Sequence, residues 1–144
     1  MTDSHKHLEM GIIDKVVEKS IVYNSDVETG MVIKIHAIND VDYNIEIHNT
    51  RTKEYMIIDS SVIFAIMGTN LLSGDDVEIS TSPGEKYVHL IRDGVVYNIL
   101  NALTMNSTWL LLRRGDNLIS MYSPNDDMLD LQIQISHYTL YEGI

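Results

Sequence analysis

Residues 71–121 consist of short apolar runs separated by turn residues, and the rest of the chain is arranged around this stretch. Val77 and Ile79 alternate with polar neighbours, which is the period of a half-buried β-strand. Pro83-Gly84 favours a two-residue connection with positive φ at the glycine, and Asp93-Gly94 is a strong hairpin signal. The pattern therefore predicts a series of hairpins. Its expected strands are residues 76–80, 87–92, 95–97, 108–112 and 118–121, with an excursion at 98–106 and a turn at 115–116.

The clearest strand pair in the first half is predicted at residues 31–38 and 41–49, where apolar residues recur at every second position. Direct pairing of these strands brings their apolar faces together only if the loop has an odd number of residues. We therefore expect a loop of residues 39–41, which places Lys34 opposite Glu46.

Four further segments complete the pattern. Residues 53–59 predict another strand. Residues 129–141 predict the last and longest strand, in which apolar residues alternate with Asp, Gln and Ser until the alternation fails beyond His137. Residues 11–22 fit either a helical turn or an edge strand, and the apolar run within 61–72 fits either a doubly buried strand or one buried helical turn.

These elements predict an all-β fold, a two-layer antiparallel β-sandwich with at most one or two short helical turns. The chain has 144 residues and a mass of 16.4 kDa, which suits one domain with its own core. We expect a flexible extension at residues 1–14 and a single sandwich domain at residues 15–144.

Composition and charge narrow the range of partners. The formal net charge of −11 argues against nucleic acid, because phosphate contacts need clustered Lys and Arg. No apolar run approaches the roughly 20 residues of a membrane span, so no membrane partner is expected. The chain has no cysteine, which excludes a disulfide or a thiolate metal site.

The sequence gives no clear sign of a reaction centre. Nucleophilic catalysis needs a Ser or Cys beside an oriented base, and no Gly-x-Ser-x-Gly motif occurs. Asp75-Asp76 and the cluster of Asp126-Asp127 with Asp130 could bind calcium, but neither has the spacing of a calcium loop. Solvated turn carboxylates are therefore favoured. We predict that the protein is not an enzyme and has no cofactor.

His36 and His48 are expected on strand faces that point away from the apolar set, and His89 is expected opposite Glu78. The first two histidines could bind zinc together with Glu46. Such a site needs at least one further ligand, so exposed strand histidines are favoured and no metal site is predicted.

Two further motifs have a structural and a functional interpretation. Trp109 is the one tryptophan and could stack on a sugar ring, although a lone Trp in a β-sandwich is more often part of the core. Arg114-Gly115-Asp116 spells an integrin-recognition tripeptide, but with Asn117 it is also what a tight hairpin turn requires. The turn is favoured.

The turn motifs together resemble a known family. They are, in order, Gly74-Asp75, Pro83-Gly84-Glu85-Lys86, Asp93-Gly94, Ser107-Thr108-Trp109-Leu110 and Arg114-Gly115-Asp116-Asn117, followed by the ending Tyr141-Glu142-Gly143-Ile144. In this order and spacing, residues 16–144 are similar to the C-terminal β-sandwich of the siphophage distal tail protein, a phage tail component. The resemblance implies a galectin-like or jelly-roll sandwich.

The resemblance also implies a structural function in a phage tail, baseplate or tail-like particle. Distal tail proteins form a ring, usually hexameric, that joins the tail tube to the tip and holds receptor-binding proteins. A separate N-terminal domain makes that ring, and none is recognisable here, so we expect either an excerpt or a shortened relative. The expected partners are other tail or baseplate proteins and possible copies of the chain itself. The expected location is the virion, or the host cytoplasm during assembly.

We expect partner contacts at the mixed-polarity ending, through Tyr138, Leu140, Tyr141 and Ile144, and at the apolar run 62–67. The alternative function is a carbohydrate-binding module of galectin-like fold, in which Trp109 stacks on the sugar. No matching set of Arg, His and Asn can be placed on one strand face, so assembly is favoured.

Overall fold

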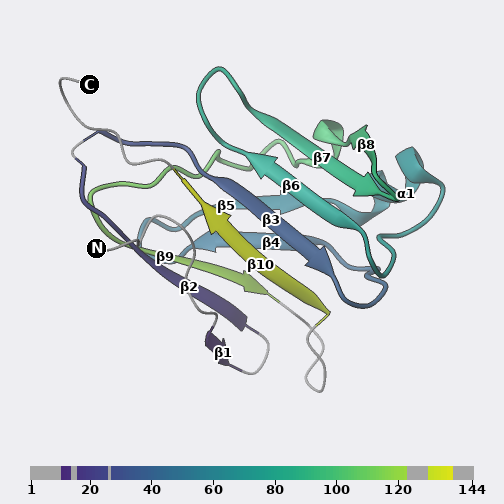
Figure 1. Cartoon of the computed structure of the whole chain (residues 1–144), viewed down its shortest axis with the longest axis horizontal. Helices are drawn as coiled ribbons and strands as arrows, with labels where there is room; N and C mark the ends of the chain where they lie inside the picture. The colour runs from purple at the N-terminus through teal and green to yellow at the C-terminus, as the bar shows by residue number, and fades with distance from the viewer. Residues whose placement is uncertain (1–10, 14–15, 26, 123–129, 138–144) are drawn as a thin grey trace.

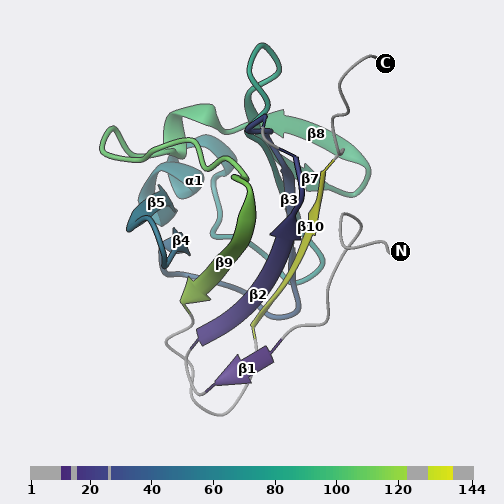
Figure 2. The same cartoon turned by 90° about the vertical axis from the view of Figure 1, so that its left-hand side faces the viewer.

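The computed structural model describes residues 11–13, 16–25, 27–122 and 130–137. It confirms the predicted fold class, because two five-stranded antiparallel sheets stack into a sandwich (Figure 1). One sheet has the order β1-β2-β9-β4-β5: Gly11–Ile13, Val16–Tyr23, Gly115–Tyr122, Ile45–Asn49 and Glu54–Ile58. The other has the order β10-β3-β6-β7-β8: Leu131–Ser136, Val32–Ala37, Asp76–Ser80, Tyr87–Arg92 and Val95–Asn98. Figure 2 shows the two layers from the side.

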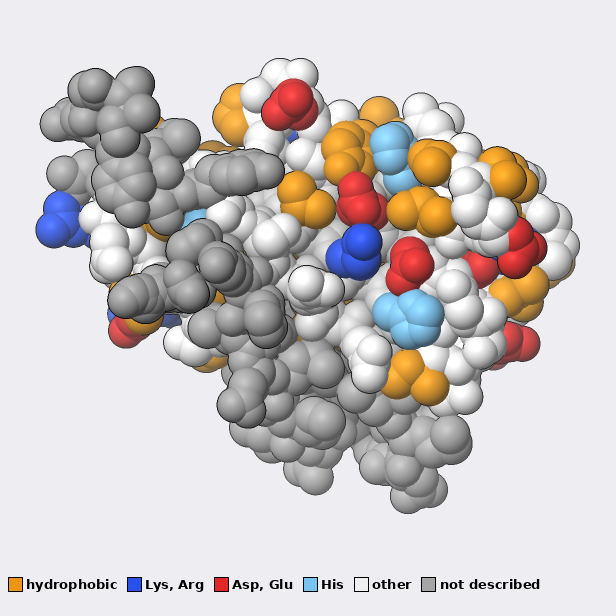
Figure 3. Space-filling view, in the orientation of Figure 1, with side chains coloured by type: hydrophobic (Ala, Val, Ile, Leu, Met, Phe, Trp, Pro, Cys, Tyr) orange, Lys and Arg blue, Asp and Glu red, His pale blue; other side chains and the backbone are white. Residues whose placement is uncertain are grey.

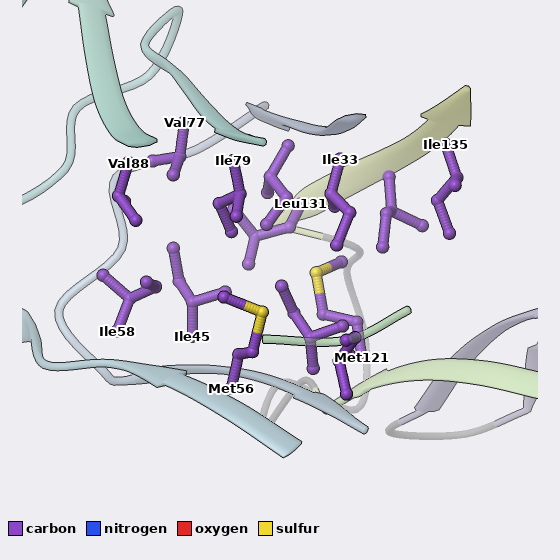
Figure 4. Packing of buried hydrophobic residues seen from close by; sticks show 14 of the residues in the cluster. Ile33, Ile45, Met56, Ile58, Val77, Ile79, Val88, Met121, Leu131 and Ile135 are labelled. Carbon is purple, nitrogen blue, oxygen red and sulfur yellow. The ribbon is translucent and has the colours of Figure 1, made fainter. Parts of the chain in front are cut away.

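The core lies between the sheets, where alternate side chains of the strands meet (Figure 4). Ile33 and Ile79 from one sheet lie across from Met56 and Met121 of the other, and all four are buried. Burying one such side chain stabilises the fold by about 1.5–3 kcal/mol. The period-two pattern therefore predicts correctly which face of these strands is buried.

The predicted pairing of residues 31–38 with 41–49 is wrong. β3 pairs with β10 and β6, whereas β4 pairs with β5 and β9 in the opposite sheet. The connection crosses between the layers, and Val41 bonds through its N–H to the Leu71 carbonyl at 2.8 Å on the way. Alternation determines which face is buried but contains no information about which strand lies alongside.

The predicted contact of Lys34 with Glu46 fails for the same reason. Lys34 lies opposite Glu78 of β6, with 3.8 Å between the Lys Nζ and Glu Oε1 atoms. Both side chains are on the outer face of the β10-β3-β6-β7-β8 sheet, where such a pair contributes at most about 1 kcal/mol.

The hairpins predicted at Pro83-Gly84 and Asp93-Gly94 form, but only the second has the predicted two-residue connection. Asp93 and Gly94 have φ values of 52° and 77° and make the two-residue turn between β7 and β8. The β6–β7 register is the predicted one, but its ladder begins at Ser80 and Tyr87, so the connection spans residues 81–86. Thr81 leaves that ladder because its N–H bonds to the Met31 carbonyl at 3.0 Å.

Residues 108–112 are not the predicted strand, and no hairpin turn forms at Arg114-Gly115-Asp116. Thr108 and Leu112 bond to two different neighbours, the carbonyls of Tyr55 and Thr29, so no continuous ladder develops. Gly115 instead begins β9, with a φ of 97°. β9 then runs between β2 and β4 instead of folding back on the preceding segment.

The two ambiguous segments are resolved. Within residues 61–72 the chain forms the helix α1, Ser60–Met67. Asp59 caps its first turn through a 2.8 Å bond from the Ser61 N–H, and Gly68 ends it with a φ of 78°. Residues 11–22 contribute β1 and most of β2, so the described part of the predicted extension at 1–14 is a strand.

The last predicted strand is shorter than residues 129–141. Its apolar face is buried and its Gln and Ser face is exposed, as expected, over β10. Asp130 was expected on the exposed face but is buried, because it precedes the strand and accepts hydrogen bonds from Asn39 and Tyr43 at 3.1 and 3.0 Å.

The outer edge of β5 is covered by the segment that follows β8. This cover, residues 102–108, begins in the 3-10 turn η1, Leu100–Ala102. The N–H groups of Thr104 and Thr108 bond to the carbonyls of Ile57 and Tyr55, and Ser107 Oγ accepts from the Ile57 N–H at 2.9 Å. The main chain of β5 is therefore paired on both sides.

Candidate functional site

The predicted partner-contact residues Tyr138, Leu140, Tyr141 and Ile144 lie outside the described residues. His137, just before them, is buried and meets the Tyr23 ring edge-on with 5.5 Å between ring centroids. The other predicted contact, the run 62–67, lies in α1.

Trp109 is half-buried in the irregular segment that precedes β9, where it packs against the edge of the core. The Lys86 ammonium lies over its ring, 5.6 Å from the centroid. This position agrees with the favoured structural interpretation more than with an open sugar-stacking platform, because Lys86 occupies a place where a sugar would approach.

The acidic candidates that the structure describes, Asp75, Asp76 and Asp130, all have side-chain partners and are not the solvated turn carboxylates that were favoured. Asp75 is buried and forms a two-point ion pair with Arg92, at 2.7 Å to Nη2 and 3.0 Å to Nε. Asp76 bonds to His36 at 2.8 Å, and Asp126-Asp127 lies outside the described residues. Within the described part of the chain, no group of three Asp, Glu, His or Cys residues could hold a metal ion.

The strand histidines face outward, as expected, and they do not meet. His36 belongs to β3 and His48 to β4, so the two lie in opposite sheets and cannot share a zinc ion with Glu46. His48 instead contacts Glu46 on its own strand at 3.3 Å. His89 lies opposite Glu78, which confirms that prediction.

The outer face of the β10-β3-β6-β7-β8 sheet carries a mixed polar network (Figure 3). Tyr87 donates a 2.5 Å hydrogen bond to Glu78, and its ring stacks on His89 with 4.2 Å between centroids. The bond to the Glu78 carboxylate raises the pKa of Tyr87 to about 12, because it stabilises the protonated phenol. The groups of this network therefore satisfy one another.

A serine and a histidine lie side by side on the other sheet. Ser120 of β9 is the cross-strand neighbour of His48. The Ser120 hydroxyl is buried, and within the described part of the chain it has no hydrogen-bond partner. A nucleophile must reach both a base and a substrate, so this arrangement is not that of a catalytic pair.

A polar pocket of about 290 Å³ lies where β9 begins. It is lined by Asn49, Arg51, Thr52, Arg113, Arg114, Gly115, Asp116 and Asn117, which include three of the chain's four arginines. The Asn117 amide accepts from the Arg113 N–H at 3.0 Å and donates to its carbonyl at 2.8 Å, which fixes the chain at this point. The interpretation of residues 114–117 as a turn gave no indication of this pocket.

The charges of this pocket are largely balanced. Arg113 contacts Glu54 at 2.9 Å and Glu28 at 2.6 Å, and Arg51 lies 3.7 Å from Asp116. The hydrogen bond to Glu54 raises the pKa of Arg113 and lowers that of Glu54. The ion pairs of Arg113 therefore connect the segment just before β9 with β5 and with the segment around Glu28.

The largest chemical contrast on the molecule is an uncharged end. Residues 60–74 and 95–112 contain no Asp, Glu, Lys or Arg, although 22% of the chain is charged. These segments form α1, β8 and η1, and α1 contacts η1. Several of their apolar side chains are exposed: Phe64 50%, Ile66 41%, Val95 51%, Val96 57%, Tyr97 38% and Leu100 41%. We call the part of these segments formed by α1, η1 and β8 the uncharged end.

None of the described helices has both the length and the apolar character needed to cross a membrane. Comparisons of the chain with protein-family models, with curated proteins and with solved structures gave no match.

Proposed function

We propose that this domain is a structural module that acts through protein–protein assembly, and that the assembly is a phage tail or a tail-like particle. The observation that carries the first part is the exposure of apolar side chains at the uncharged end of an otherwise acidic protein. The second part is supported by the order and spacing of the sequence motifs that resemble those of phage tail components.

The composition of the uncharged end suits an interface. Scattered exposed apolar residues are ordinary on any protein, so their grouping is the relevant feature. Interface centres are depleted in charged residues and enriched in aromatic ones. Here Phe64 on α1 and Tyr97 on β8 are exposed within segments that lack charge altogether. A partner that contacts these segments therefore meets no charged side chain from them.

The alternative, a carbohydrate-binding module, has less support. It needs an accessible aromatic face with polar groups converging beside it. Trp109 is half-buried beneath Lys86, and the polar groups around Tyr87 bond to one another.

The proposal can be tested in cells that encode the chain. We expect a tagged chain to be recovered in sedimenting particles of tail-like shape, with Phe64→Ser lowering recovery at least tenfold. The matched control is Ala65→Ser, at an exposed position of the same helix. Both variants should keep the parent's melting temperature within a few degrees. Recovery of the chain only as a free 16.4 kDa species would contradict the proposal.

A further inference from the structure

β8 is an edge strand that is exposed on both faces. Its residues Val95, Val96 and Tyr97 carry apolar side chains to both sides of the sheet. Natural edge strands are commonly protected by Lys, Pro, a bulge or a covering loop, because a bare edge pairs with other strands. β8 contains neither Lys nor Pro, and its ladder with β7 is continuous.

The free main-chain groups of β8 can be identified. The Ile99 N–H bonds to the Val88 carbonyl at 2.9 Å, so the main chain at Ile99 points toward β7. These groups alternate in direction along an antiparallel strand. The N–H and C=O groups of Val96 and Asn98 therefore point to the free edge. Each of these residues offers one donor and one acceptor to a new strand.

A second copy of the chain fits this edge because β8 is complementary to itself: its outward main-chain groups lie symmetrically on either side of Tyr97, and its side chains carry no charge. Two copies that each carry a net charge of −11 repel one another across most of their surface. Residues 95–112 bring no charge to the contact, so pairing of two β8 strands places no like charges opposite one another within the strands. The edge is also apolar on both faces, and a second β8 has the same character.

We propose that β8 pairs antiparallel with β8 of a second copy, about a two-fold axis through Tyr97. This inference rests on the proposed assembly function and names a partner for part of the uncharged end. The register sets Val96 opposite Asn98 of the second copy, so every outward main-chain group of these residues finds a partner. In the alternative register, with Val96 opposite Val96 of the second copy, only one residue of each strand would form main-chain hydrogen bonds across the interface. The β8-containing sheet of one copy then continues into the same sheet of the second copy. The interface is symmetric and closes as a dimer.

The Tyr97 side chains meet at the axis of this dimer. Tyr97 lies at a position whose main chain points toward β7, so it faces Tyr97 of the second copy as a non-hydrogen-bonded pair. Such pairs have close Cα atoms, about 4.5 Å apart, and their aromatic side chains interact well. A four-residue strand gives a small interface, so we expect association only above about 10 μM.

Cysteine trapping tests the register. Because the chain has no cysteine, a single introduced thiol has only one possible partner in a dimer. We expect Tyr97→Cys to form an intermolecular disulfide at least tenfold faster than Val96→Cys, whose counterparts are offset along the strands. Equal rates for the two variants would overturn the register.

Sedimentation of the full chain tests the dimer itself. We expect the mass to rise from 16.4 kDa toward twice that value as the concentration increases from about 1 μM to 1 mM. Val96→Pro removes an outward N–H without breaking the ladder to β7, and should weaken association at least tenfold. Val96→Thr keeps that N–H and should not, and circular dichroism should show both variants folded.

A parent chain that stays monomeric throughout this range would overturn the inference. It would leave the particle test with Phe64→Ser intact. Conversely, a dimer that forms in a chain never recovered in particles would count against the proposed function alone.

Discussion

β5 and β8 each end a sheet, and they differ in what lies along their outer edge. The main chain of β5 is met by residues 102–108, which bond to Tyr55 and Ile57. Among the described residues, no segment lies beside the outer edge of β8, and all four of its residues are exposed. In β5, by contrast, Met56 and Ile58 are fully buried.

The comparison shows that the chain covers the outer main-chain groups of β5 and leaves those of β8 uncovered by any described segment. The cover on β5 is irregular: the N–H groups of Thr104 and Thr108 bond to β5, and the buried Leu110 follows two residues later. Among the described residues the outer edge of β8 has no such cover, so this edge is open to the strand pairing proposed above.

The largest effect is expected at Leu110, just beyond the cover on β5. Leu110 is fully buried, so Leu110→Ala should lower the free energy of unfolding by about 2–5 kcal/mol through the cavity it leaves. Val96→Ala on the bare edge should change the free energy of unfolding by no more than about 0.5 kcal/mol at low concentration. Urea denaturation of both variants measures this, and equal losses would show that the two edges do not differ as described.

A smaller effect is expected from one hydrogen bond of the cover. Ser107→Ala leaves the Ile57 N–H without its acceptor and should cost about 1–2 kcal/mol. Amide hydrogen exchange should show Ile57 exchanging faster in this variant. Ser107→Thr retains the hydroxyl and should retain the protection. If the Ile57 amide exchanges equally slowly in Ser107→Ala, the Ser107 hydroxyl does not protect it from exchange.

The pH dependence of β5 should be modest. The Arg113 hydrogen bond lowers the pKa of Glu54 below its ordinary value of 4.5. A lowered pKa means that the ion pair stabilises the fold above about pH 4.5 and that this contribution is lost as pH falls through the lowered value. Glu54→Gln should therefore reduce the acid-induced loss of stability by about 0.5–1 kcal/mol, measured by denaturation between about pH 6 and pH 3. Glu85→Gln, at an exposed turn, is the control, and a similar reduction there would contradict the assignment.

The smallest effect on stability is expected at Tyr87 of β7, the strand that pairs with β8. Its raised pKa means that the bond to Glu78 contributes below pH 10 and is lost as pH rises through about 12. In Glu78→Gln one tyrosine should titrate closer to 10, with a change in neutral-pH stability within about 1 kcal/mol. Ultraviolet absorbance follows this titration, and Tyr87→Phe assigns it. An unaltered titration curve in Glu78→Gln would argue against the bond.

The sequence predicts local features of the fold well. The alternation around Val77 and the turn at Asp93-Gly94 depend on neighbouring residues only, and both predictions are confirmed. The pairing of residues 31–38 with 41–49 depends on the rest of the sheet, and there the prediction is wrong. Burial of Asp75 likewise depends on Arg92, which is distant enough in sequence to leave no local signal.

The uncharged end could be predicted in part. The apolar run 62–67 was expected to contact partners, and its Phe64 is exposed. The bare edge at β8 was missed, because both faces of a strand become exposed only where the opposite sheet ends. The absence of charge from residues 95–112 is visible in the sequence and is the signal that could have indicated this edge.

The strand order also constrains how the domain reaches its native state. β9 lies between β2 and β4, and β10 lies beside β3, so each layer joins distant parts of the polypeptide. Closing such long loops precedes any gain from the contacts, which places the folding time in the range of about milliseconds to seconds. On the ribosome, β3 stays without one of its neighbours until residues 131–136 have been synthesised. Chaperones that shield nascent chains are therefore expected to act on this protein late in its translation.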